Sequence, residues 1–324
     1  MRARDVSETA RLLEDLGYDD LWIPDQSFHH DPFVLLTRCA AATSSIRLGI
    51  AVTNPLTRHP VQIARAAATL GELSGGRFVL GLGAGNRSRL LPSLDLPSDR
   101  AAVRIAEAID VCRAILRGDE VSFRGRTIVA DGIRLEADRP PMVPIFVGAR
   151  GRRVLRVAGS KADGVFAEGM FTPGGIDHVL AEVGVGAREE GRSLADLEIL
   201  AWQAIRLSTT LAARDDRPYR RWAALMIRGT DPDVLATLGI DPRVITATRD
   251  AFDRGGEEAG ARLVSEDAIT RLLFSGDPDQ VRAHVERVRE RGYAGVAVIA
   301  FGDTDLARDT LRRFAEDVVA RIDR

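Results

Sequence analysis

Small and polar residues follow several apolar runs of this 324-residue chain, and they are the first candidates for chemistry. Glycines alternate at Gly81, Gly83 and Gly85, and Asn86 follows them. A strand end without side chains would let a flat ligand or a phosphate approach the backbone N–H groups. A polar loop follows these glycines instead of a helix N-terminus, so the spacing does not match a dinucleotide fingerprint. Close packing of the strand against a helix would explain Gly81 alone equally well.

A second turn could bind an anion. Residues 148–151 (GARG) follow an apolar run and precede a predicted helix at residues 152–160. Backbone N–H groups and the positive end of the helix dipole would face an anion there. Arg150, Arg152 and Arg153 add positive charge. The alternative is a plain turn between a strand and a helix.

Asp25 ends another apolar run, where its carboxylate could accept a hydrogen bond from a ring N–H or a hydroxyl. It could instead cap the next helix, but His29, His30 and Asp31 intervene, which makes capping by Asp25 a weaker explanation. The same three residues might suggest a metal site. No further ligand cluster is visible in the sequence, so we expect no metal.

Arg58 and His59 stand just before a predicted helix at residues 60–73. They could face a substrate, as could His29, or they could form hydrogen bonds within their own loop. These three side chains are therefore candidates for substrate binding.

The candidates follow separate apolar runs, so the fold has to bring the ends of these runs together. The predicted strands are residues 20–24, 46–52, 77–82, 144–147, 164–166, 197–207 and 295–300. The predicted helices between and after them include residues 60–73, 100–117, 152–160, 176–190, 278–291 and 304–322. Most of the strands are apolar throughout, as is typical of parallel strands buried on both faces. An open sheet binds its ligand at one switch point, whereas a barrel gathers residues from many loops, so the pattern favours a (β/α)8 TIM barrel over an open sheet.

Three features depart from a regular barrel. Residues 121–124 and 126–129 predict a small hairpin around Gly125. Residues from 209 to about 263 predict a helical insertion before the last strand, of a kind that often covers a site or forms a subunit contact. Residues 1–16 already predict a helix, so we expect the first barrel strand to be missing. Nothing indicates a second domain, and residues 1–324 are expected to form a single one.

The amino-acid composition limits the kinds of binding partner that we expect. A formal charge of −2 and a pI near 6.3 give no excess of positive charge for nucleic acid or an anionic membrane. Cys39 and Cys112 are isolated in apolar stretches, which predicts buried thiols in a reducing compartment. The N-terminus lacks an apolar signal segment and no run is long enough to span a membrane. We therefore expect a cytoplasmic protein that acts on a small molecule.

The sequence resembles the luciferase-like monooxygenase superfamily, and in particular its F420-dependent branch typified by methylenetetrahydromethanopterin reductase. The matching motifs are residues 52–60 (VTNPLTRHP), 73–77 (LSGGR), 148–151 (GARG) and 275–278 (SGDP). The resemblance implies a bacterial-luciferase-like barrel. A missing first strand would leave an open seam in that barrel, which dimerisation or the insertion from Thr209 must cover, and we expect a homodimer. It also implies a cis peptide bond between Ala51 and Val52 that backs a tricyclic ring, and a cofactor phosphate at residues 148–151.

The resemblance also assigns residues to coenzyme F420, with FMN as the alternative cofactor. The implied cofactor-binding residues are Asp25, Ala51, Val52, Thr53, Asn54, Ala84, Gly85, Asn86, Gly148, Ala149, Arg150 and Gly151. Asn86 stands where the reductases carry an acidic residue, and an asparagine side chain cannot act as an acid. The sequence therefore assigns no catalytic residue.

The expected function is hydride transfer between F420 and a small organic substrate. One alternative is an FMN-dependent monooxygenase, in which reduced flavin activates oxygen. Another is a non-catalytic cofactor-binding barrel, which Asn86 and the missing first strand would suit.

Overall fold

The computed structural model describes residues 2–26, 28–86, 90–136 and 142–322. The chain forms two compact units. We call Arg2–Phe166 with Glu182–Leu197 the N-terminal unit, and Ala167–Ala181 with Glu198–Arg324 the C-terminal unit. All the cofactor-binding residues that the resemblance implies lie in the N-terminal unit. The expectation of a single domain remains a prediction.

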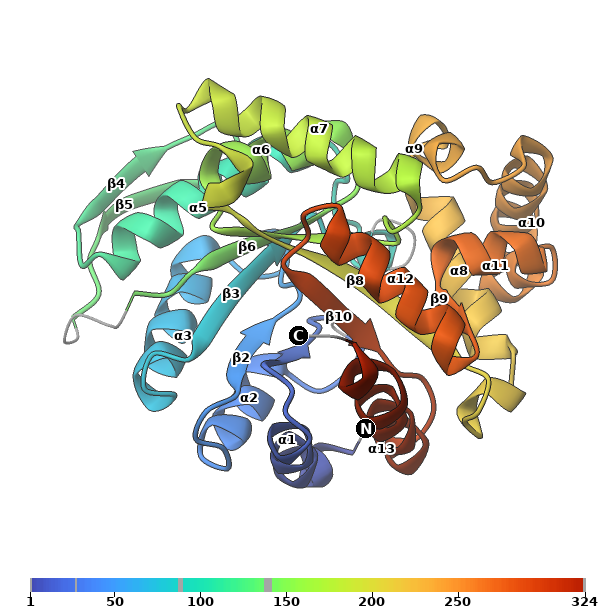
Figure 1. Ribbon diagram of the computed structural model, residues 1–324. Helices are drawn as coiled ribbons and strands as arrows, with labels where there is room; N and C mark the ends of the chain where they lie inside the picture. The colour runs from blue at the N-terminus through green and yellow to red at the C-terminus, as the bar shows by residue number, and fades with distance from the viewer. Residues whose placement is uncertain (1, 27, 87–89, 137–141, 323–324) are drawn as a thin grey trace. The chain divides into compact units, whose positions relative to one another are not determined.

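The main sheet has the strand order β1-β2-β3-β6-β7-β8-β10, and β9 pairs with β8 (Figure 1). Its strands are β1 (Asp20–Ile23), β2 (Arg47–Ile50), β3 (Phe78–Gly83), β6 (Ile145–Ala149), β7 (Gly164–Glu168), β8 (Glu198–Leu207), β9 (Phe274–Gly276) and β10 (Gly295–Ile299). The pairings of β1 with β2, β2 with β3, β3 with β6, and β8 with both β9 and β10 are parallel. Parallel strands that alternate with helices form the nearly closed βα barrel that the sequence predicts.

Helices of the N-terminal unit lie against strands next to them in the chain: α2 contacts β2 and α3 contacts β3, the strands that come after them, and α6 contacts β6, the strand before it. The helices before the insertion are α1 (Val6–Asp15), α2 (Pro32–Ala40), α3 (Pro60–Leu73), α4 (Leu90–Ser93), α5 (Ala101–Leu116), α6 (Arg152–Lys161) and α7 (Pro173–Glu189). Of the described residues before β1, Ala3–Asp5 form a 3-10 helix and the next ten form α1, so no strand precedes β1 among them. Each of the seven predicted barrel strands lies within two residues of an observed one at both ends.

Two sequence predictions need correction. The helical insertion consists of α8 (Arg217–Gly229), α9 (Pro232–Thr237), α10 (Pro242–Ala261) and α11 (Glu266–Leu272). It lies before the last strand, as predicted, but β9 follows it directly, and the sequence analysis missed β9 because three residues are too few to show a strand pattern. The last predicted helix also ends early: α13 is Thr304–Arg313, and a π-helical and a 3-10 turn follow it, while α12 (Pro278–Glu290) matches its prediction closely.

The hairpin is β4 (Val121–Arg124) with β5 (Val129–Ile133), so the predicted second strand, residues 126–129, is wrong except for its last residue. Residues 126–128 instead form the turn, and their three backbone N–H groups donate to the carboxylate of Glu107 at 2.5 to 3.0 Å. A buried carboxylate that accepts hydrogen bonds from several backbone N–H groups stabilises a turn, as the hydrogen bonds between paired strands stabilise a sheet. Sequence periodicity gave no sign of this partner on α5.

Three aromatic rings pack together inside the N-terminal unit. Trp22, Phe146 and Phe166 come from β1, β6 and β7, and their ring centroids are 4.8 to 5.8 Å apart. A Cβ atom at Gly49 would lie 2.0 Å from the Trp22 ring, and one at Gly164 would lie 2.5 Å from the Phe146 ring. These two glycines therefore make room for aromatic rings in the core.

Both cysteines are buried, as the sequence predicts. Burial raises the pKa of the Cys39 and Cys112 thiols to about 12, because the thiolate is disfavoured away from water. Both thiols are therefore unreactive at neutral pH.

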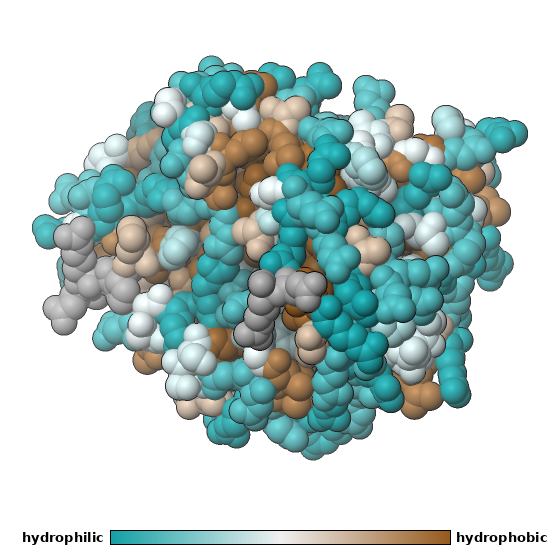
Figure 2. Space-filling view, viewed as in Figure 1, coloured by the Kyte–Doolittle hydropathy of each residue, from teal (hydrophilic) through white to brown (hydrophobic). Residues whose placement is uncertain are grey.

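The visible surface is mostly hydrophilic, with hydrophobic residues in patches that hydrophilic side chains interrupt (Figure 2). Within the described ranges, no helix is long and apolar enough to cross a membrane.

Glu14 offers a test of how α1 is joined to the loop before β2. Its Oε1 atom accepts hydrogen bonds from the backbone N–H groups of Ser44, Ser45 and Ile46 and from the Ser45 hydroxyl, at 2.6 to 2.9 Å. These bonds, the one from Ile46 first, lower the pKa of Glu14 to about 2. Since the folded-state pKa lies below the unfolded value, the stabilisation is complete above about pH 5 and is lost as the pH falls towards 2.

We expect Glu14→Gln to lower the free energy of unfolding by about 1 to 2 kcal/mol at neutral pH, a value that allows for solvent screening. The difference from the unmodified protein should shrink as the pH falls below about 4.5, and urea unfolding at several pH values measures it. Asp15→Asn is the matched control, because Asp15 is the exposed neighbour on the same helix. An equal effect of both substitutions at neutral pH would contradict the assignment.

Candidate functional site

The turn after β2 has the geometry that the resemblance implies: the peptide bond between Ala51 and Val52 is cis. The Val52 side chain lies against the ends of two other strands. Its Cγ2 atom is 2.3 Å from the position of a Cβ at Gly83, and its Cγ1 atom is 3.0 Å from that at Gly148. These glycines therefore make room for Val52, and the strand end at Gly83 is not the bare backbone that the sequence suggested.

Gly81 is required by an even closer approach. A Cβ there would lie 1.9 Å from the backbone oxygen of Ile50. Next to it, the N–H of Thr53 donates to the Gly81 carbonyl at 2.9 Å, and the N–H of Gly83 donates to the Thr53 carbonyl at 2.8 Å. Close packing thus explains Gly81, as one interpretation of the sequence held, but the contact is with β2 and not with a helix.

Asp25 lies beside this turn and is almost completely buried, with 5% of its side chain exposed. Its Oδ2 atom accepts hydrogen bonds from the Thr53 hydroxyl at 2.7 Å and from Arg58 Nε at 3.0 Å. Its Oδ1 atom has no hydrogen-bond partner within the described parts of the chain. Since no described residue donates to this atom, Asp25 suits a ligand N–H or O–H group.

Arg58 contacts three neighbouring side chains. In addition to Asp25, it donates from Nη2 to Asp31 Oδ2 at 2.6 Å, and its guanidinium lies 5.0 Å from the centre of the Phe33 ring. Burial disfavours the charged form, but the hydrogen bonds to Asp31 and Asp25 outweigh it and raise the pKa of Arg58. The structure therefore agrees with hydrogen bonding within the loops, the alternative to a substrate contact.

Asp31 is a residue whose part in the site the sequence analysis missed. Its Oδ1 atom caps α2 by accepting from the N–H groups of Phe33 and Val34 at 2.9 and 3.4 Å. The helix cap is therefore Asp31 and not Asp25. An aspartate directly before a proline is a helix-start signal, so the cap was open to prediction. The ion pair of Asp31 with Arg58, which is 27 residues further along the chain, could not be predicted from the sequence.

His59 caps α3. The N–H of Val61 donates to its Nδ1 atom at 3.3 Å, so Nε2 carries the proton and donates to the carbonyl of Val129 on the hairpin at 3.1 Å. The third substrate candidate, His29, is exposed. Across the described ranges, no group of three or more His, Cys, Asp or Glu side chains could hold a metal ion.

Asn54 forms hydrogen bonds within the turn and has a side-chain N–H donor without a partner. Its Oδ1 atom accepts from the N–H groups of Leu56 and Thr57 at 3.1 and 3.0 Å. Its Nδ2 atom is buried without a partner, as is the Thr57 hydroxyl. Asn54 also lies against Gly85, whose φ of 78° favours glycine. Asn54 and Gly85, which lie far apart in the sequence, are thus neighbours in space.

Residues 148–151 lead into α6 as predicted. Gly151 is the N-cap residue of α6, and no side chain caps this helix, unlike α2, α3 and α12. The N–H groups of its first turn suit an anion. The expected positive charge is partly neutralised, because Arg152 pairs with Glu182 at 2.9 Å, whereas Arg153 is exposed.

A narrow recess lies beside the end of β3. It is lined by Pro55, Leu56, Gly83, Ala84, Ala101, Arg104 and Ile105. The recess has no enclosed space for even a water molecule, so it is not itself a pocket for a cofactor or a drug-sized ligand.

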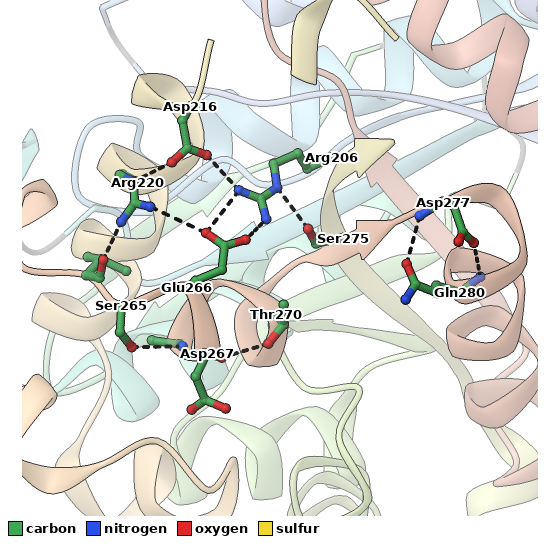
Figure 3. A network of polar contacts seen from close by, with 12 residues as sticks. Arg206, Asp216, Arg220, Ser265, Glu266, Asp267, Thr270, Ser275, Asp277 and Gln280 are labelled. Carbon is green, nitrogen blue, oxygen red and sulfur yellow. Dashed lines mark hydrogen bonds and ion pairs between the residues drawn. The ribbon is translucent and has the colours of Figure 1, made fainter. Parts of the chain in front are cut away.

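A second polar cluster lies in the C-terminal unit, at the ends of β8 and β9 (Figure 3). Arg206 donates to the Ser275 hydroxyl at 2.8 Å and to Asp216 at 2.6 Å, and it also pairs with Glu266. Arg220 on α8 pairs with the same two carboxylates. Two arginines facing two carboxylates leave no net charge. This cluster therefore explains how α8 and α11 attach to the strand ends, and it is not our candidate site.

The barrel fold, the cis peptide bond after β2 and the uncapped helix after β6 define a class of protein. The chain belongs to the luciferase-like monooxygenase family, whose model matches residues 1–295.

Three proteins are similar to this chain over most of its length. The chain is 29% identical over 311 residues to the 5,10-methylenetetrahydromethanopterin reductase of Archaeoglobus fulgidus, covering 93% of this chain and 90% of the relative. It is 30% identical over 336 residues to the F420-dependent glucose-6-phosphate dehydrogenase of Beutenbergia cavernae, covering 98% and 93%. The solved structure of the coenzyme F420-dependent tetrahydromethanopterin reductase from Methanopyrus kandleri is similar with a TM-score of 0.83 and 25% identity, covering 100% of this chain and 96% of that one.

Proposed function

We propose that this protein is an F420-dependent oxidoreductase that transfers a hydride between the coenzyme and a small organic substrate. The observation that carries the proposal is Asp25: its carboxylate is 95% buried beside the cis turn at Ala51 and Val52, and no described residue donates to one of its two oxygens. The names of the relatives support the identity of the coenzyme.

The residues at the site fit such a coenzyme in three ways. The Oδ1 atom of Asp25 is an available acceptor for a ring N–H or hydroxyl group. The Nδ2 atom of Asn54 is a buried donor without a partner. The first turn of α6 has no side-chain cap and suits a phosphate. When bound, the deazaflavin ring supplies a two-electron carrier that accepts or donates hydride, and the chain's own residues bind it, orient it and exclude water.

We assign the coenzyme to the residues that the resemblance implies. Asp25 and the turn of residues 51–54 would hold the ring, and residues 84–86 would border it. Gly148, Ala149, Arg150 and Gly151 would hold the phosphate. Asn86 supplies no acid, and no proton donor is assigned.

Titration of the purified protein with F420 and with FMN tests the proposal. We expect F420 to bind with a dissociation constant in the micromolar range or lower, which the fluorescence of the ligand measures. We expect no oxygen consumption with either reduced cofactor. Oxygen consumption with reduced FMN would instead establish the monooxygenase. Failure to bind either cofactor would overturn the proposed function and also exclude a non-catalytic cofactor-binding barrel.

The uncapped helix gives a separate prediction. We expect Gly151→Asp to cap α6 with a carboxylate, because Gly151 has the extended backbone of an N-cap residue (φ −82°, ψ 142°). The same carboxylate would occupy the N–H groups offered to the phosphate, so F420 affinity should fall at least tenfold while the melting temperature is unchanged or higher. Gly151→Ala, which adds no charge or acceptor, is the control. Full F420 affinity in a stably folded Gly151→Asp protein would place the phosphate elsewhere.

We further propose that the protein acts in the cytoplasm as a homodimer and binds no nucleic acid. The small net charge of −2 supports the absence of nucleic-acid binding, and the buried free thiols suit a reducing compartment. Analytical ultracentrifugation measures the oligomeric state, and a monomer at micromolar concentration would contradict the homodimer.

A further inference from the structure

The loop between β1 and α2 is pinned at both of its ends by one side chain. Between Asp25 and Asp31, the described residues Gln26, Phe28, His29 and His30 are all exposed. Arg58 reaches from the loop before α3 to both aspartates, at 3.0 Å to Asp25 and 2.6 Å to Asp31. The guanidinium of Arg58 thus bridges Asp25 and Asp31, the two ends of this short loop.

The two aspartates divide their oxygens between separate tasks. Asp31 uses Oδ1 to cap α2 and Oδ2 to bind Arg58. Asp25 uses Oδ2 for Thr53 and Arg58, which turns Oδ1 away from both. The planar fork of an arginine holds two acceptors in a fixed geometry, which a point charge does not do. The position of Asp25 Oδ1 therefore depends on Arg58 and, through it, on Asp31.

We propose that Arg58 is a positioning residue: it orients the Asp25 carboxylate for the coenzyme and holds together the two ends of the loop, at Asp25 and Asp31, and it does not bind substrate. This inference rests on the proposed function only where Asp25 is said to bind F420. Two observations oppose a substrate contact. The guanidinium already neutralises part of the charge of two carboxylates, and Phe33 covers its face. An anionic substrate would have to share the guanidinium with an aspartate that is 95% buried and with one that caps a helix.

Three variants separate the roles. Arg58→Gln removes the charge, and Arg58→Lys keeps the charge without the fork. Asp31→Asn keeps an oxygen for the α2 cap, because asparagine is as good a cap as aspartate, but it loses the acceptor for Arg58. Arg117→Gln is the matched control, because Arg117 forms an exposed ion pair with Asp119 elsewhere in the same unit.

The first measurement is the dissociation constant of F420. We expect it to rise about tenfold or more in Arg58→Gln and about threefold in Arg58→Lys and in Asp31→Asn, with no change in Arg117→Gln. The effect of Asp31→Asn is decisive, because Asp31 acts on Asp25 only through Arg58. Unchanged F420 affinity in all three variants of the bridge would mean that Arg58 does not position Asp25.

The second measurement needs no ligand. Hydrogen exchange of the backbone amides of residues 28–34 should be at least fivefold faster in Arg58→Gln than in the unmodified protein, with partial recovery in Arg58→Lys. If the unmodified protein binds no F420, the proposed function fails, and this exchange measurement still decides whether Arg58 holds the two ends of the loop together. Equal exchange in the Gln variant and the unmodified protein would overturn that part.

Discussion

Gly81→Ala should destabilise the protein by about 3 kcal/mol or more, at the upper end of what overpacking a core costs. The added Cβ would lie 1.9 Å from the backbone oxygen of Ile50, and a backbone atom cannot rotate away as a flexible side chain can. The hydrogen bonds of Thr53 to Gly81 and Gly83 hold the two strands together at this point, so the strain cannot be relieved by separating them without losing those bonds. Urea unfolding measures the loss.

Gly295→Ala is the control for this prediction. Gly295 lies in β10, also a parallel strand, but its added Cβ would meet only Leu200 Cδ2, at the ordinary contact distance of 3.6 Å. We expect it to be neutral or to stabilise the protein by up to about 1 kcal/mol, because alanine has less freedom to lose in the unfolded chain. Similar effects of the two substitutions would show that the close approach of Gly81 to Ile50 is wrong.

Gly81→Ala could prevent folding altogether, and a second pair of substitutions avoids this difficulty. An added Cβ at Gly83 would meet Cγ2 of Val52 at 2.3 Å, which is a side-chain atom that Val52→Ala removes. We expect the double variant Gly83→Ala with Val52→Ala to be more stable than the sum of the two single changes predicts, by about 1 kcal/mol or more. Additive effects would mean that Val52 does not lie against Gly83.

Asp25→Asn should weaken F420 binding about 10- to 30-fold, with a loss of at most about 1 kcal/mol in stability. The amide oxygen can still accept from Thr53 and Arg58, as Oδ2 does, but the amide nitrogen in place of Oδ1 cannot accept a hydrogen bond from a ligand. The substitution thus removes the one oxygen without a described partner and preserves the other contacts. Fluorescence titration with F420 measures the affinity, and urea unfolding measures the stability.

Asp20→Asn is the matched control, because Asp20 lies at the opposite end of the same strand, β1. There it pairs with Arg47, at 2.5 Å to Nε and 2.8 Å to Nη2. Breaking this pair should affect stability without changing F420 affinity. If Asp25→Asn binds F420 as tightly as the unmodified protein does, Asp25 is not a ligand of the coenzyme.

Much of the fold was open to prediction, because buried parallel strands leave apolar runs and the helices between them have clear ends. The helix of residues 60–73 was predicted at both ends, since Pro60 starts it and Ser74 and Gly75 follow it. β9 escaped prediction, because three residues carry no periodicity. The second hairpin strand was misplaced, because the turn is held by Glu107, which the local sequence does not contain.

The candidate site divides in the same way. The sequence by itself determined which residue types stand at the strand ends, and the resemblance located the cis peptide bond at Ala51 and Val52. Only the tertiary structure decided what those residues do to one another. It showed that Gly81 makes room for the Ile50 carbonyl and Gly83 for Val52.

The tertiary structure also joined Asp25 to Thr53 and Arg58, which are 28 and 33 positions away in the chain. The physical reason is that pairing of parallel strands brings distant strand ends side by side, and a hydrogen bond then depends on distances of a few tenths of an ångström. A linear pattern records which side chains are present at a strand end. It does not record which of them meet.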